Sequence, residues 1–125
     1  MIIQEAAEMY LETILALSQS LENVRSIDIA KKMGYSKPTV SVMMKDFREN
    51  GFIEMSDKGY ITLTKKGLAI AESIFERHNV IAKILMDLGV DKKTAYEDSC
   101  KIEHHLSDQS FQCIKEYFSK NPPQL

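Results

Sequence analysis

The residues best suited to chemistry are a cysteine, a glutamate and a histidine in the C-terminal part of the chain. Cys100, Glu103 and His104 follow the spacing i, i+3 and i+4, which would place a thiolate, a carboxylate and an imidazole on one helix face. Each is an electron-pair donor for a divalent transition ion, and one helix cannot close a coordination shell alone. The spacing predicts a metal site that needs ligands from elsewhere.

Further ligands are available on two other predicted helices. Met9 and Glu12 form an i, i+3 pair near the N-terminus, and His78 lies midway along a long helix. Each has an ordinary alternative, since methionine is more often a core residue and a single histidine is usually a surface residue. The second cysteine, Cys113, lies on an aromatic-rich helix and is expected in the core. Two cysteines are too few for a disulfide scaffold, which favours free thiols or metal ligands.

The N-terminal half contains the elements of a winged helix-turn-helix. Apolar residues with a 3.6-residue rhythm predict a helix over residues 4–19, and Ser26 and Ser36 are expected to cap two shorter helices. These end at Gly34 and Gly51, and Pro38 fits the first turn of the second one. Two apolar stretches, 52–55 and 60–63, flank a turn and predict a hairpin, the wing.

The C-terminal half is predicted to be helical. Thr64 is expected to cap a helix reaching Gly89, Asp91 begins another that reaches about His105, and Ser107 caps the last one. The fold class is therefore mainly α, with three helices and a two-stranded wing followed by a helical dimerisation segment. The domains expected are 1–63 for DNA binding, 64–120 for metal binding and dimerisation, and 121–125 as a flexible tail.

The second helix of the helix-turn-helix is the predicted DNA-reading element. Its first turns would offer side chains to base edges, with the Pro38 ring and the Thr39 methyl suited to a thymine methyl. Lysines and an arginine nearby would meet phosphate. The predicted DNA-binding residues are Arg25, Lys31, Lys32, Ser36, Lys37, Pro38, Thr39, Ser41, Lys45 and Lys58.

The charge distribution supports this division of roles. The net charge is −2, yet residues 24–67 hold nine Lys or Arg against five Asp or Glu, and the rest of the chain is acidic. No apolar run approaches the roughly 20 residues that cross a bilayer, and the N-terminus lacks a basic signal-peptide start. A cytoplasmic protein with no membrane partner is expected.

Several separated motifs resemble the diphtheria toxin repressor family, including its iron-dependent and manganese-transport branches. They are residues 8–14, 28–30, 36–41, 63–67, Arg77-His78 and 100–107. The resemblance implies a homodimeric repressor of metal-uptake genes that binds a palindromic operator of double-stranded DNA. It also implies that one divalent metal joins the first helix to the dimerisation helices through Met9 or Glu12, His78, Cys100, Glu103 and His104.

The resemblance is mixed with respect to the metal. Met9 and Cys100 look like iron-branch ligands, whereas Glu12 matches a manganese-branch ligand, and Ala82 and Tyr96 replace the Glu and His of iron-branch ancillary sites. The chain is also expected to lack the C-terminal SH3-like domain of many iron-branch members. Sulfur ligands favour iron, nickel or zinc over manganese, and the sulfur positions look like those of the iron branch, so Fe2+ is the predicted cofactor and Mn2+ is the next candidate.

Other functions compete with this hypothesis. A manganese-responsive repressor and a winged-helix regulator that does not sense metal both stay open. A metal-dependent hydrolase is disfavoured, since there is no Gly-rich phosphate loop, no nucleophile elbow and no His-Glu-x-x-His helix. A protein-interaction module fits the basic excess poorly. The sequence therefore predicts a regulator and not an enzyme.

Overall fold

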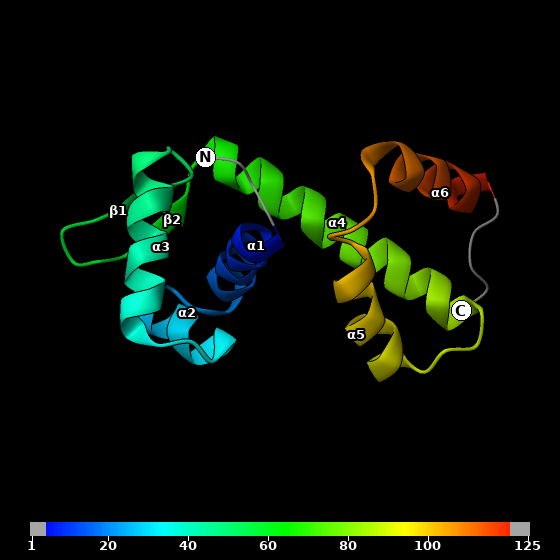
Figure 1. Ribbon diagram of the computed structural model, residues 1–125, viewed down its shortest axis with the longest axis horizontal. Helices are drawn as coiled ribbons and strands as arrows, with labels where there is room; N and C mark the ends of the chain where they lie inside the picture. Colours follow the sequence, from blue (N-terminus) through cyan, green and yellow to red (C-terminus); the bar gives the residue numbers. More distant parts are fainter. Residues whose placement is uncertain (1–4, 121–125) are drawn as a thin grey trace. The chain divides into compact units, whose positions relative to one another are not determined.

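The computed structural model describes residues 5–120, and this part of the chain is mainly α-helical, as predicted (Figure 1). It holds six helices and one antiparallel hairpin in the order α1 (Glu5–Ser20), α2 (Ser26–Met33), α3 (Lys37–Glu49), β1 (Ile53–Met55), β2 (Ile61–Leu63), α4 (Lys65–Asp87), α5 (Lys92–Ile102) and α6 (Asp108–Lys120). None of the described helices is both long and apolar enough to cross a membrane. The predicted tail, 121–125, lies outside the described residues.

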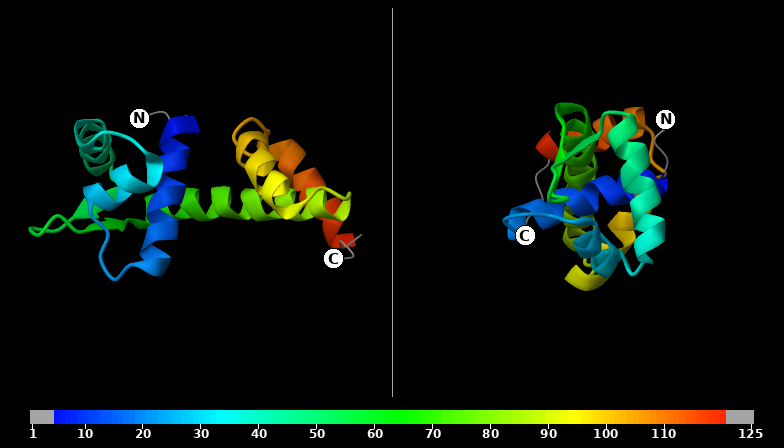
Figure 2. Two further views of the ribbon diagram at one scale, coloured as in Figure 1. Left: turned by 90° about the horizontal axis from the view of Figure 1, so that it is seen from below. Right: turned by 90° about the vertical axis from the view of Figure 1, so that its left-hand side faces the viewer.

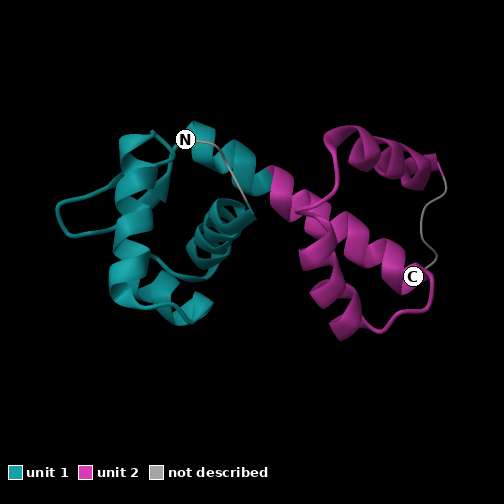
Figure 3. Cartoon of the chain, viewed as in Figure 1, with its two compact units in different colours: residues 1–72 teal, residues 73–125 magenta. Residues whose placement is uncertain are grey.

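The chain forms two compact units, Met1–Glu72 and Ser73–Leu125 (Figure 3). The division falls inside α4, so that the first turns of this helix belong to the first unit and the remainder to the second. The sequence-based boundary between residues 63 and 64 lies at the N-terminal end of the same helix, and it stays a prediction.

Short-range hydrogen bonds explain where most helices begin. The Ser36 hydroxyl accepts from the Thr39 N–H, and Thr64 and Ser107 cap α4 and α6 in the same way. Asp91 caps α5, and the hydrogen bonds from Thr94 hold the pKa of its carboxyl below the ordinary value. These four predicted caps are confirmed.

The cap predicted for α2 is wrong. Ser26 is the first residue of that helix, and Arg25 occupies the cap position. The Arg25 backbone N–H donates to the Asp28 carboxylate at 2.9 Å, so the acidic residue of the first turn reaches back to the cap residue, as in a capping box.

The first unit packs α1, α2 and α3 around an aromatic centre. The Phe47 ring contacts Tyr10 and Phe52 edge to face, with ring centroids 6.2 and 5.9 Å apart. The strands pair in antiparallel register, Ile53 with Leu63 and Met55 with Ile61. Figure 2 shows the loop between the strands projecting away from the helices, as expected for a wing.

The start of the wing is tied to the start of α4 within the first unit. The Thr64 hydroxyl donates to the Gly51 carbonyl at 2.7 Å, and the Thr64 N–H donates to the Phe52 carbonyl at 3.1 Å. Gly67 lies so close to this strand that an added Cβ would be 2.1 Å from the Phe52 carbonyl oxygen. The absence of a side chain at position 67 therefore sets how closely the helix approaches the wing.

The second unit contains the remainder of α4 with α5 and α6. On α6, Phe111 is buried and Ile114 and Phe118 are half-buried, whereas Cys113 is exposed. The prediction that Cys113 is a core residue is wrong, because two residues after Phe111 correspond to a rotation of about 200° around the helix. Tyr117 also lies off this face and is 62% exposed.

Candidate metal centre and nucleic-acid interface

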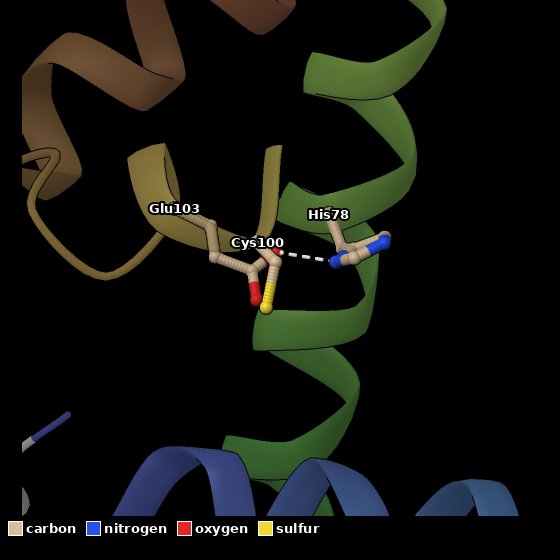
Figure 4. Close-up of side chains that lie close together, drawn as sticks. All are labelled: His78, Cys100 and Glu103. Atoms are coloured by element: carbon tan, nitrogen blue, oxygen red, sulfur yellow. Dashed lines mark ion pairs between the residues drawn. The ribbon is translucent and has the colours of Figure 1, made fainter. Parts of the chain in front are cut away.

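Three of the predicted metal ligands meet within the second unit. His78 comes from α4, Cys100 from the last turn of α5, and Glu103 from the turn that follows (Figure 4). Their ligand atoms all lie within 4.8 Å of one another. Ligands of one tetrahedral ion, with bonds of 2.0–2.3 Å, lie about 3.5 Å apart, so small side-chain rotations would suffice to place all three on a single ion.

Glu103 is the centre of this cluster. Its side chain is fully buried, with Oε2 3.1 Å from His78 Nδ1 and Oε1 3.2 Å from His104 Nε2. Both distances are within ion-pair range, but neither carboxylate oxygen makes a hydrogen bond of regular geometry to the described residues. A buried carboxylate is costly unless it is well paired or binds a metal. The nitrogen, sulfur and oxygen donors that converge here fit a divalent transition ion.

The helix predicted to carry Cys100, Glu103 and His104 ends earlier than expected. α5 ends at Ile102, and Glu103 and His104 lie in the turn beyond it, where the His105 N–H bonds to the Ile102 carbonyl. The imidazole that joins Cys100 and Glu103 in the three-residue cluster is His78, from another helix. The His104 side chain is only 1% exposed and faces the other oxygen of Glu103.

The remaining predicted ligands lie in the first unit. Met9 and Glu12 are both half-buried on α1, three residues apart. The cluster of His78, Cys100 and Glu103 is contained in the second unit, and the participation of Met9 and Glu12 stays a prediction. Ala82, which cannot ligate a metal, is fully buried on α4.

All ten predicted DNA-binding residues are exposed on the first unit. Two of them have structural roles as well: the Ser36 hydroxyl contacts Thr39 Oγ1 at 2.8 Å, and Arg25 Nη2 donates to the Tyr60 hydroxyl at 3.3 Å. The Arg25 guanidinium also lies over the Tyr60 ring. Arg25 therefore links the start of α2 to the start of β2, beside the wing.

Two further residues of α3 are exposed but are not among the predicted DNA-binding residues. Val42 is 63% exposed, four residues after Pro38, so it is an apolar side chain available to a thymine methyl. Arg48 is exposed and shares a face with Ser41 and Lys45, where these residues line a hollow of about 220 Å³. Residues 41, 45 and 48 follow helical spacing, so the sequence alone could have placed Arg48 on the same face as Ser41 and Lys45.

Protein-family comparisons match nearly the whole chain in two consecutive segments. The model described as iron dependent repressor, N-terminal DNA binding domain, matches residues 3–67. The model described as iron dependent repressor, metal binding and dimerisation domain, matches residues 64–122. The chain belongs to the iron-dependent repressor family.

Individual relatives agree with this assignment. The chain is 31% identical to the transcriptional regulator MntR of Escherichia coli O6:H1, over 94% of this chain and 76% of that one. It is 32% identical to an uncharacterized helix-turn-helix transcriptional regulator of Methanocaldococcus jannaschii, over 94% and 96%. The structure of the manganese regulator SloR matches with a TM-score of 0.77 and 29% identity, covering 95% of this chain and 55% of SloR.

The chain thus spans about half the length of SloR, and within that half it has the fold of the family. Iron-dependent repressors are metal-dependent transcriptional regulators and not enzymes, which confirms the predicted recognition, fold class and absence of catalysis. The family relationship also supports DNA and a second copy of the chain as partners, because the matched segments are a DNA-binding and a dimerisation domain.

Arg77 holds the turn that carries Glu103 in place. Its guanidinium, only 12% exposed, donates to the Glu103 carbonyl at 3.1 Å and to the Leu106 carbonyl at 2.8 Å. It also pairs with the Asp108 carboxylate and lies 5.1 Å from the centre of the Phe111 ring. These bonds satisfy two carbonyls of the turn that follows α5.

Replacing Arg77 is expected to loosen the metal ligands. In Arg77→Gln the two carbonyls lose their charged donor, so metal affinity should fall about tenfold and the apo protein should unfold at a lower temperature. Chelator-competition titration and thermal unfolding measure these effects. Asp108→Asn is the matched control, because the Asp108 side chain is 96% exposed and its ion pair is worth little. A lowered unfolding temperature with unchanged metal affinity would show that Arg77 stabilises the unit without positioning Glu103.

Proposed function

We propose that this protein is a homodimeric transcriptional repressor that binds a palindromic operator when it holds Fe2+. The observation that carries the proposal is the buried Glu103 carboxylate, which converges with Cys100 and His78 in the second unit. The exposed cations and hydroxyls of α2, α3 and the wing support DNA binding by the first unit.

The residues that would hold the ion are His78, Cys100 and Glu103, with His104 beside the second oxygen of Glu103. A divalent ion supplies positive charge and empty orbitals at this point, which offset the charge of the carboxylate and of a cysteine thiolate. Glu103 and Cys100 would bind it in their ionised forms, with Cys100 held by the last turn of α5 and Glu103 by the turn that follows. Three protein ligands leave at least one position open.

We propose that Met9 and Glu12 fill the open positions. Both are half-buried on α1, and a thioether and a carboxylate three residues apart can reach one ion from a single helix face. Ligands from α1 would tie the first unit to the second when the metal is bound. In a dimer this would fix the distance between the two recognition helices. Operator affinity would then be high when that distance matches the spacing of the two half-sites.

Operator-binding titrations under anaerobic conditions test this function. With free ion concentrations set by a chelator buffer, the apo protein is expected to bind its operator at least tenfold more weakly than the loaded protein. Operator affinity that does not change on chelation would favour the winged-helix regulator that does not sense metal.

The choice of Fe2+ rests on the sulfur ligand of the cluster. A thiolate is a softer donor than a carboxylate and discriminates against Mn2+, so Fe2+ should activate at a lower free concentration than Mn2+. Cys100→Asp should reduce or reverse the difference between the Fe2+ and Mn2+ concentrations needed for activation. Cys113→Ser, which changes an exposed thiol of the same unit, should leave that difference unchanged. Activation of the unaltered protein by Mn2+ at lower concentration would identify a manganese-responsive repressor instead.

A further inference from the structure

A small hollow lies on the first unit where α2, α3 and β1 come together. It measures about 220 Å³, and α3 contributes most of its wall. The residues that line it are Ser26, Ser41, Met44, Lys45, Arg48 and Met55. We call this feature the α3 hollow.

The lining of the α3 hollow combines positive charge with hydroxyl groups. Lys45 and Arg48 are exposed cations, and among the residues that the structure describes neither is paired with a carboxylate. Ser26 and Ser41 add two hydroxyls, and no acidic residue lines the hollow. The remaining wall consists of buried Met44 and half-buried Met55, which are apolar and carry no negative charge that would repel an anion. The set is complementary to a small anion with several acceptor oxygens.

The start of α2 adds to this complementarity. Ser26 is the first residue of that helix, whose positive dipole end favours negative charge, and the Asp28 carboxylate of the same turn is already engaged with the Arg25 N–H. An arginine guanidinium, with its planar fork of donors, matches two oxygens of one phosphate. A phosphate therefore suits the α3 hollow better than a carboxylate, because it can accept from Arg48, Lys45 and a serine at the same time.

We propose that the α3 hollow binds one phosphate of the DNA backbone, with Arg48 as its principal ligand and Lys45, Ser26 and Ser41 as further donors. This inference rests on the proposed DNA-binding function and adds a contact at the end of α3 opposite to its base-reading turns. Lys37 and Arg48 are separated by about 16 Å along the helix, since each residue rises 1.5 Å. The major groove is about 12 Å wide, so cations at both ends of α3 can reach its two walls.

A phosphate contact at Arg48 would affect how α3 sits in the DNA groove. A helix held by phosphates at one end only can tilt in the groove, whereas contacts at both ends fix its depth and angle. Arg48 is therefore expected to act equally on every DNA sequence, in contrast to the residues of the first turns, which discriminate among bases.

Salt-dependent DNA binding tests the proposal with the full chain in its metal-loaded state. Fluorescence anisotropy would measure affinity for an operator duplex and a scrambled duplex over a series of KCl concentrations. Arg48→Gln is expected to weaken the binding of both duplexes about fivefold to tenfold. It should also lower the magnitude of the slope of log affinity against log salt by about 0.9, the value for one phosphate contact. Arg48→Lys should recover most of the loss. Lys93→Gln, which removes one exposed charge from the second unit, is the matched control and should change neither quantity.

Other results would overturn the proposal. A loss confined to the operator duplex would assign Arg48 to base reading, and an unchanged slope with unchanged affinity would remove it from the interface. The hollow could instead take a free anion. In that case inorganic phosphate at constant ionic strength would raise the unfolding temperature of the unaltered protein but not of Arg48→Gln, and DNA affinity would be equal for both. Failure of the unaltered loaded protein to bind any operator would instead contradict the proposed function itself.

Discussion

Glu103→Gln is expected to lower the affinity for the activating metal at least 100-fold and to abolish metal-dependent operator binding. The amide keeps the shape of the carboxylate but removes the charge that lies between His78 Nδ1 and His104 Nε2 at the buried centre of the cluster. A factor of 100 corresponds to about 2.7 kcal/mol of binding free energy. Isothermal titration or chelator competition would measure the affinity, and anisotropy would measure operator binding.

The thermal stability of the same variant separates metal binding from folding. Because glutamine fills the same volume and can hydrogen-bond to an imidazole, apo Glu103→Gln should unfold within a few degrees of the apo parent. The rise in unfolding temperature that metal gives to the parent should disappear. Glu97→Gln, an exposed acid on α5, is the matched control and should behave like the parent in both measurements. A Glu103→Gln protein that still gains stability from metal would show that Glu103 is not a ligand.

Gly67→Ala is expected to destabilise the first unit by at least about 3 kcal/mol. The new Cβ would lie 2.1 Å from the Phe52 carbonyl oxygen, far inside van der Waals contact, and the obstacle is backbone that cannot rotate away. That carbonyl also accepts the hydrogen bond of the Thr64 N–H, so relief of the clash would disturb the start of α4. The unfolding temperature measured by circular dichroism should fall by about 10 °C or more.

Gly59→Ala is the control for this substitution. Gly59 lies in the turn of the wing at φ +81°, and an added Cβ would meet no atom within 4 Å. Its alanine variant should cost only the strain of a left-handed backbone, about 1 kcal/mol. Equal losses at the two positions would show that the close approach between α4 and the wing is not what limits position 67.

Much of the local structure follows from the sequence because it depends on residues within one helical turn. The hydroxyls of Ser36, Thr64 and Ser107 and the carboxylate of Asp91 cap helices through bonds that span three residues, and such bonds can be predicted from spacing. The same holds for the chemical identity of the candidate ligands and for the excess of cations in residues 24–67.

The end of α5 shows where local reasoning fails. Arg77, which is 26 residues from Glu103 in the chain, donates to the Glu103 carbonyl and holds the turn that follows the helix. A tertiary hydrogen bond of this kind cannot be predicted from the spacing of residues within one segment.

The candidate metal centre divides in the same way. By itself the sequence determined which residue types could bind a divalent ion. It also determined that residues 24–67, in the N-terminal half, carry an excess of positive charge. The resemblance to a known family had already implied that His78 joins Cys100 and Glu103. Only the tertiary structure decided that the Glu103 carboxylate is buried and that Arg48 shares a hollow with Ser26. The physical reason is that burial and partner choice depend on how separate helices pack, whereas capping, periodicity and charge are properties of a single segment.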